Sequence, residues 1–327
     1  MPGALTFCKR VLAAALVAAS AAPAESQAPA GSPPAAAAMT YADLADLALE
    51  APVAAQVRIA AATAVKADRA PDLKPGLARF YVEAALVSLI RSPQSLPERL
   101  SYIVDLPRDS RGKAPKLRKG SEFLLLAAPV PGRPGELRLA APDAQIPFTA
   151  ERAATLRSIV RESSSASPPP RIAGIGRAFH VPGAIRGESE TQFFLQTAGG
   201  TPVSLTVLRR PGETPQWAVA LSEIVDEAAE PPAPGTLLWY RLACGLPRTL
   251  PRQSLAESDS EGAAAIQADY RLVLDRLGPC VRTRRGAEGG NRHAGEIRDP
   301  GTRSLGGSPR GPGFRRDDGR ASGLSPG

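Results

Sequence analysis

Residues 191–224 read TQFFLQTAGGTPVSLTVLRRPGETPQWAVALSEI, and they decide the fold of the C-terminal half. Three segments rich in β-branched and aromatic residues (191–197, 203–208 and 216–224) are separated by turns that contain Gly and Pro. Short apolar runs bounded by such turn residues are typical of consecutive strands. A further run at 172–181 precedes them, so the sequence predicts a four-stranded antiparallel meander.

The N-terminal half shows a similar strand pattern. Apolar and polar residues alternate with period two at 80–86 and at 100–106, which favours strands. The segments 123–126 and 137–139 flank a turn with the sequence PGRPG, which indicates a hairpin.

Helices are predicted on both sides of these strands. Thr40 with Asp43 three residues later marks a helix start, and a second Ala-rich segment (53–66) follows Pro52. A further helix is predicted over 149–162. The fold class expected from these patterns is α+β, with two small β-rich halves, each an antiparallel meander flanked by helices.

The C-terminal half ends in a predicted pair of helices, at 237–244 and around 266–277, and the second has apolar residues at helical spacing. Cys244 lies at the end of the first helix, and Cys280 follows the second. The third cysteine, Cys8, lies in an N-terminal segment with the pattern of a secretory leader, and its removal on export would leave these two. Two cysteines in an oxidising compartment pair by default. The sequence therefore predicts a disulfide between Cys244 and Cys280 that staples the helix pair.

The N-terminus has the pattern of a secretory signal peptide. Lys9 and Arg10 precede a short apolar run, and Ala-Pro-Ala at 22–24 offers a cleavage site. The run is shorter than a membrane-spanning helix requires, so no transmembrane segment is expected in the mature chain. The alternative is a start at Met39, the first residue of the predicted folded part.

Composition divides the chain into six segments. They are a signal peptide (1–24), a Pro/Ala linker (25–38), an N-terminal half (40–162), a Ser/Pro linker (163–170), a C-terminal half (171–280) and an Arg/Gly-rich tail (281–327). The tail has too few apolar residues to bury a core, and it is expected to be disordered.

Basic residues outnumber acidic ones by 40 to 32, but the excess is unevenly distributed. Of the 40, 34 are Arg, a bias typical of GC-rich coding sequence. Residues 40–280 carry 28 basic and 26 acidic side chains. A region so close to neutral gives no indication of specific nucleic-acid binding.

One segment between predicted strands is strongly basic. It holds six basic side chains within twelve residues, namely Arg108, Arg111, Lys113, Lys116, Arg118 and Lys119. Such a segment either contacts an anionic lipid or polysaccharide or forms the solvated tip of a hairpin.

Residues with catalytic potential are few. His180 is the one histidine within 40–280, and it lies near Ser189, Glu188 and Glu190 in the sequence. These residue types serve in hydrolases and in general acid–base catalysis. However, the G-x-S-x-G motif is absent, and one histidine is too few for a usual zinc site. The alternative is a structural histidine at a strand end, and no metal or cofactor is expected.

Five segments carry a resemblance to a known family. They are TYADLADLALEAPVAAQVRI (40–59), GRAFHVPG (176–183), GESETQFFLQT (187–197), WAVALSEIVDEA (217–228) and LLWYRLACGLP (237–247). They resemble an uncharacterised family of exported proteins from GC-rich alphaproteobacteria, over roughly residues 40–280. The resemblance implies export and a folded unit, and it implies no activity.

The function expected from the sequence is that of an exported, periplasmic or secreted, non-catalytic envelope or binding protein. Its ligand is unknown, and its partner is an envelope protein or an anionic polymer. The first alternative is a periplasmic hydrolase that uses His180 with Ser189, or with Glu188 and Glu190. The second is a cationic protein that binds an anionic polymer through 108–119 or through the tail.

Overall fold

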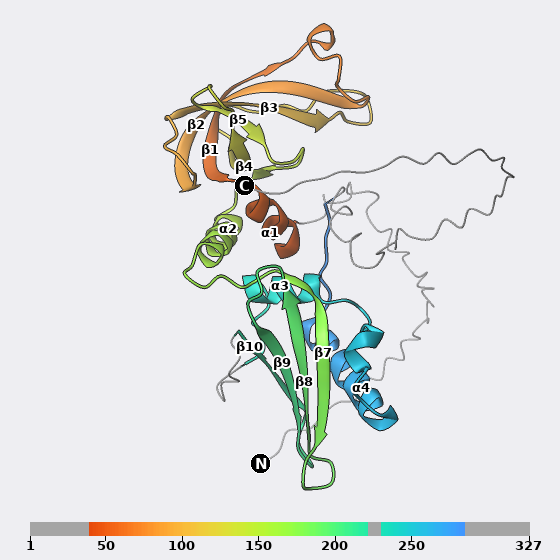
Figure 1. Cartoon of the computed structure of the whole chain (residues 1–327). Helices are drawn as coiled ribbons and strands as arrows, with labels where there is room; N and C mark the ends of the chain where they lie inside the picture. Colours follow the sequence, from red (N-terminus) through yellow and green to blue (C-terminus); the bar gives the residue numbers. More distant parts are fainter. Residues whose placement is uncertain (1–38, 222–229, 285–327) are drawn as a thin grey trace, which may run out of the picture. The chain divides into compact units, whose positions relative to one another are not determined.

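The computed structural model describes residues 39–221 and 230–284 (Figure 1). The predicted signal peptide, the Pro/Ala linker and the tail beyond residue 284 lie outside the described residues. So do residues 222–224 at the end of the last predicted strand. The described residues form a mixed α+β structure of two compact units.

The two units are not consecutive in the sequence. The described residues of the first unit are 39–169, 232–244 and 274–284. Those of the second unit are 170–221, 230–231 and 245–273. Residues 232–244 and 274–280 of the predicted C-terminal half, and residues 281–284 of the predicted tail, therefore belong to the unit of the N-terminal strands.

The first unit is built on a closed five-stranded barrel. Its strands are β1 (Val53–Ala64), β2 (Leu77–Arg91), β3 (Arg99–Pro107), β4 (Glu122–Pro129) and β5 (Glu136–Leu139). They lie in the order β1-β2-β3-β5-β4, and β1 pairs with β4 to close the ring. A short strand β6 (Gln145–Pro147) adds to β4.

Most predicted strands of this unit are confirmed, but their arrangement is not a meander. The hairpin between β4 and β5 is present, with Ala127 opposite Leu139. In addition, β5 pairs in parallel with β3, where Ser101 lies opposite Glu136. The expected antiparallel meander is therefore wrong for this half, because pairings between distant strands close the sheet on itself.

The helix expected for the Ala-rich segment 53–66 is wrong, because this segment forms strand β1. Val53, Ala55, Val57 and Ile59 point into the barrel core, and Ala54 on the opposite face packs against helices. Because residues 53–57 of β1 are buried on both faces, their small side chains fit between the barrel core and the covering helices. Tertiary packing here outweighs the helix propensity of alanine.

Three helices cover the outer face of β1, β4 and β6. They are α1 (Tyr41–Glu50), α2 (Ala150–Ser163) and α3 (Leu237–Gly245), and they share one apolar cluster with Leu124, Leu126 and Ile146. The predicted start of α1 is confirmed, since Thr40 and Asp43 form a reciprocal capping box.

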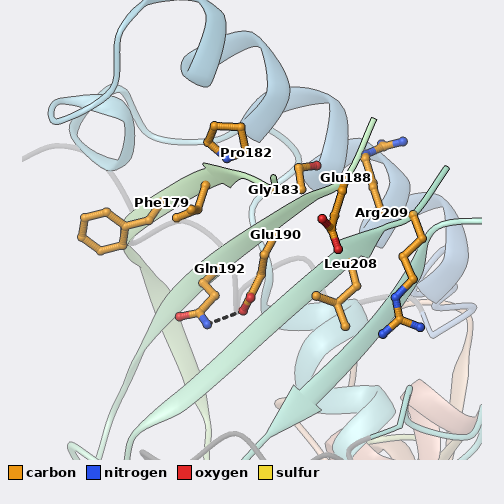
Figure 2. A pocket seen from close by; sticks show the side chains of 11 residues that line it. Phe179, Pro182, Gly183, Glu188, Glu190, Gln192, Leu208 and Arg209 are labelled. Carbon is orange, nitrogen blue, oxygen red and sulfur yellow. Dashed lines mark hydrogen bonds between the residues drawn. The ribbon is translucent and has the colours of Figure 1, made fainter. Parts of the chain in front are cut away.

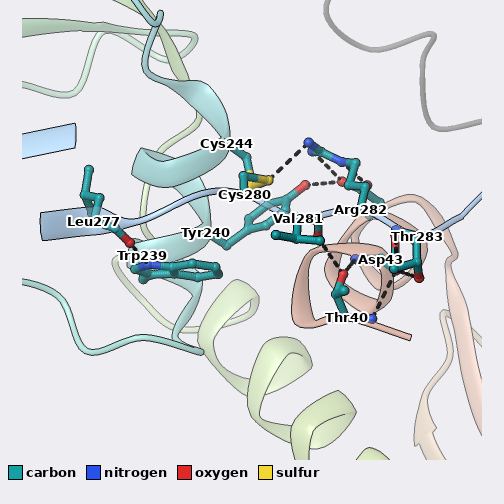
Figure 3. The surroundings of a disulfide bond; sticks show 11 residues. Thr40, Asp43, Trp239, Tyr240, Cys244, Leu277, Cys280, Val281, Arg282 and Thr283 are labelled. Atoms are coloured by element: carbon teal, nitrogen blue, oxygen red, sulfur yellow. Dashed lines mark hydrogen bonds and ion pairs between the residues drawn. A yellow bond between two sulfur atoms is a disulfide. The ribbon is translucent and has the colours of Figure 1, made fainter. Parts of the chain in front are cut away.

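The disulfide between Cys244 and Cys280 is present, with the two Cα atoms 5.1 Å apart (Figure 3). It joins the end of α3 to the segment that follows α4 (Ser260–Leu277). The indole Nε1–H of Trp239 donates to the carbonyl oxygen of Leu277 at 2.8 Å, next to the bridge. The bridge and this hydrogen bond hold the chain after residue 277 against α3.

Residues 281–284 lie against the start of α1 (Figure 3). The buried carboxylate of Asp43 accepts hydrogen bonds from the backbone N–H of Thr283, from its hydroxyl and from the backbone N–H of Arg284. Arg282 pairs with Asp46 at 2.7 Å, and Arg284 pairs with Asp143 at 2.8 Å. We call residues 281–284 the C-terminal clasp.

The second unit is a four-stranded antiparallel sheet with one long helix. The strands are β7 (Ile172–Pro182), β8 (Ser189–Thr197), β9 (Val203–Arg209) and β10 (Gln216–Ala220), each paired with the next. The meander predicted for this half is confirmed. The rings of Phe193 on β8 and Tyr270 on α4 lie 5.6 Å apart, so α4 packs on one face of the sheet. None of the described helices is long and apolar enough to cross a membrane.

We expect the disulfide to stabilise the fold measurably. The double variant Cys244→Ser/Cys280→Ser should lose about 3 kcal/mol of unfolding free energy, since its unfolded chain regains the entropy of an open loop. Urea denaturation of the full chain measures this. Dithiothreitol should lower the stability of the parent to that of the variant and leave the variant unchanged. An equal effect of reductant on both proteins would contradict a stabilising bridge.

We also expect acid to weaken the C-terminal clasp through Asp43. Burial by itself raises the pKa of this carboxyl, but hydrogen bonds from Thr283, Thr40 and Arg284 outweigh burial and hold the pKa below its usual value. The stabilisation is complete above the unfolded pKa of about 3.9 and is lost as the pH falls through the lower folded pKa.

Asp43→Asn should therefore lower the unfolding free energy by about 2 kcal/mol at neutral pH and by much less near pH 3. Urea denaturation at the two pH values measures the difference. Glu50→Gln, at an exposed position of the same helix, is the control and should change little at either pH. An equal loss for Asp43→Asn at both pH values would show that its charge contributes nothing.

Candidate functional site

The sheet of the second unit carries a shallow groove of about 480 Å³ on the face opposite α4 (Figure 2). Phe179 and Val181 from β7 and Leu208 from β9 form its apolar walls, and Glu190 of β8 lies between them. Alternation along each strand explains this composition. Odd-numbered Phe179 and Val181 point into the groove, whereas the residue between them, His180, points towards α4.

The groove is edged by carboxylates. Glu190 accepts a hydrogen bond from the side-chain amide of Gln192 at 2.6 Å (Figure 2). The side chain of Glu188 lies directly against Gly183, where an added Cβ would come within 2.5 Å of it. Because Gly183 has no side chain, the side chain of Glu188 can occupy this space.

His180 belongs to a different set of contacts, on the helix side of the sheet. Its Nδ1 lies 2.9 Å from the hydroxyl of Thr191, which donates to the carboxylate of Asp269 at 2.5 Å. Asp269 also pairs with Arg209. Because the hydroxyl of Thr191 donates to Asp269, a hydrogen bond between Thr191 and His180 requires the tautomer in which Nδ1 is the donor.

This order of groups differs from that of a hydrolytic triad, in which the imidazole lies between carboxylate and hydroxyl. Here the hydroxyl of fully buried Thr191 lies between imidazole and carboxylate. The groove brings Ser189, Glu188 and Glu190 together. Within the described residues, no hydrogen bond links any of these three to His180. The described residues also contain no cluster of three or more metal-ligating side chains.

A second surface lies on the barrel, where the outward-facing side chains of β2 and β3 are exposed or half-buried. Tyr81 and Ile103 are directly opposite each other in the register and are 42% and 51% exposed. Thr63 of β1 is the register partner of Tyr81 on its other side. We call this surface the open barrel face.

Charged side chains beside Tyr81 are paired with each other. Arg79 bridges Asp105, at 2.7 Å, and Asp72, at 2.8 Å. Hydrogen bonds that the Arg79 guanidinium donates to Asp105 and Asp72 raise its pKa above its usual range. Glu83 lies exposed on the other side of Tyr81, opposite Ser101.

The basic segment identified in the sequence forms the β3–β4 loop. Arg108 has a structural role, since its guanidinium donates to the carbonyl oxygens of Leu77 and Gly112. The other five basic side chains are exposed; they are Arg111, Lys113, Lys116, Arg118 and Lys119.

The β1–β2 loop, residues 65–76, lies at the same end of the barrel and adds Lys66, Arg69 and Lys74. The sequence analysis did not predict that these three residues join the basic segment. The distribution of lysine could have indicated Lys66 and Lys74, because every lysine after Lys9 lies in one of these two loops.

No protein-family model matches the sequence, and no curated protein is significantly similar to it. The resemblance to exported alphaproteobacterial proteins and the expected function therefore remain predictions.

We expect Arg209 to stabilise the second unit through the buried carboxylate of Asp269. Arg209→Met leaves that carboxylate, 1% exposed, without its cation and should lower the unfolding free energy by about 3 kcal/mol. Arg210→Met is the matched control. Arg210 is exposed, and its nearest carboxylate oxygen, on Glu213, is 3.9 Å away, which is too long for a strong ion pair. Urea denaturation compares the two variants, and equal losses would contradict a specific role for the Arg209–Asp269 pair.

Proposed function

We propose that this chain is an exported, non-catalytic binding protein that holds a carbohydrate chain on its open barrel face. The observation that carries the proposal is the closed barrel itself. Helices cover the outer side of β1, β4 and β6, while Tyr81 and Ile103 stay exposed on β2 and β3.

The strand order supports a ligand at this place. A five-stranded barrel in the order β1-β2-β3-β5-β4, closed between β1 and β4, has the topology of the OB-fold. In that fold, the face of strands 2 and 3 binds oligonucleotides or oligosaccharides. This likeness is an analogy of topology, so it indicates where a ligand would lie and not which ligand binds.

The chemistry of the face favours a sugar over a nucleic acid. A phosphate chain needs cations to neutralise it. On this face the charges of Arg79 and Arg99 are offset by Asp105 and Glu83. An exposed aromatic ring beside hydroxyl and carboxylate groups matches the apolar ring faces and hydroxyls of sugars.

The groups in the second unit give less support to the hydrolase alternative. Ser189 and the carboxylates line a groove, while His180 is engaged on the other face of the sheet by Thr191. Export is supported by the leader pattern and by the disulfide, since disulfides persist in oxidising compartments.

Binding of oligosaccharides long enough to cross three strands tests the proposal. The full chain is titrated calorimetrically with β-glucan and chitin-derived oligosaccharides. Tyr81→Ala should weaken binding about tenfold, because one aromatic contact is worth about 1–1.5 kcal/mol. Phe194→Ala removes an equally exposed aromatic from the second unit, and it should leave binding unchanged.

Two outcomes would count against the proposal. Equal affinity of the parent and Tyr81→Ala would remove the open barrel face as the site. Turnover of ester, peptide or glycoside substrates that is lost in His180→Gln would favour the hydrolase instead.

A further inference from the structure

Two loops from different parts of the sequence meet at one end of the barrel. The β1–β2 loop (65–76) leads into β2, and the β3–β4 loop (108–121) begins where β3 ends. Leu77 at the start of β2 lies opposite Pro107 at the end of β3. The backbone N–H of Arg108 donates to the carbonyl oxygen of Gly76, which joins the two loops directly. We call these two loops together the basic end.

The basic end concentrates positive charge. Its two loops contain nine basic and three acidic side chains, a net formal charge of +6. The rest of residues 40–280 carries 19 basic and 23 acidic side chains. The near neutrality of the folded region therefore results from one strongly positive end and an otherwise slightly negative chain.

None of the nine basic side chains has an ion-pair partner in the part of the chain that the structure describes. The nearby carboxylates are used elsewhere. Asp72 pairs with Arg79, and Asp109 accepts hydrogen bonds from the backbone N–H groups of Arg111 and Lys113. The positive charge of the basic end is thus not neutralised by this unit.

The β3–β4 loop holds its cations on a well-defined framework. Its half-buried Ala114 and Leu117 pack against the barrel core. The backbone N–H of Gly120 donates to the carbonyl oxygen of Ile59 at 2.8 Å, and the N–H of Ile59 donates to that of Ser121 at 2.9 Å. The basic side chains therefore project from a loop that needs little ordering when it binds.

We propose that the basic end docks the protein on an anionic lipid surface. Two adjacent loops at a barrel end offer many separate cations to a broad partner. Each Lys or Arg near an anionic membrane surface adds about 1 kcal/mol of attraction, so several weak contacts suffice. A lipid surface is favoured over a soluble polyanion, because exposed cations spread over two adjacent loops can each contact a broad surface at the same time.

This proposal goes beyond the carbohydrate site and does not depend on it. The residues of the basic end lie at one end of the barrel, and Tyr81 lies on its side. Lipid binding and sugar binding can therefore be lost separately.

Sedimentation of the full chain with vesicles tests the proposal. We expect binding to vesicles of phosphatidylcholine with phosphatidylglycerol, little binding to phosphatidylcholine alone, and a steep loss as salt rises. The variant Lys113→Gln/Lys116→Gln/Lys119→Gln should lower the vesicle partition coefficient by roughly 100-fold. The three lysines are exposed, so the unfolding midpoint should not change, which urea denaturation checks.

The control removes the same charge elsewhere. Arg171→Gln/Arg186→Gln/Arg248→Gln takes three exposed cations from the second unit and should leave vesicle binding within a few-fold of the parent. The tail is present in every variant, so its contribution cancels.

Three results would overturn the proposal. One is equal loss of vesicle binding in the lysine variant and in the arginine control. Another is undiminished vesicle binding by the lysine variant. The third is binding of soluble polyphosphate, lost in the lysine variant, with no binding to anionic vesicles, which would assign the basic end to a soluble polyanion.

Discussion

Strand β1 pairs on both of its edges, with β2 on one side and with β4 on the other. This double pairing closes the sheet of the first unit into a barrel. Helices cover the outer side of this region, and residues 53–57 of β1 and 124–127 of β4 are buried on both faces. On β2 and β3 the outward-facing side chains are exposed or half-buried. Closure thus separates a structural side from an open side, and it gathers the β1–β2 and β3–β4 loops at one end.

The chain returns to the barrel unit twice, at residues 232–244 and again at residues 274–284. The helix α3, the disulfide and the C-terminal clasp belong to the first unit, although more than 60 residues of the other unit precede them in the sequence. Asp43 has a double role in this arrangement, since it caps α1 and also accepts hydrogen bonds from Thr283 and Arg284. The disulfide limits how far the clasp can move from α3, because Cys280 is adjacent to Val281.

The net charge of residues 40–280 does not show how unevenly the basic side chains are distributed. The formal charge of residues 40–280 is near zero, which argued against a strongly charged partner. The barrel brings nine of the basic side chains to one end, where few acidic groups oppose them. Local concentration of charge, and not the net charge, decides whether a surface attracts an anionic partner.

The sequence by itself determined the elements that depend on local patterns. Alternation and turn residues located β7, β8 and β9, the capping pair Thr40 and Asp43 located α1, and the cysteine count predicted the Cys244–Cys280 bridge. Tertiary structure alone decided three further features. These are the strand β1 in an Ala-rich segment, the parallel pairing of β5 with β3, and the partner of His180. The physical reason is the same for all three: each depends on contacts between residues distant in the sequence, such as Thr191 with Asp269 or Val57 with Phe123, which no local period encodes.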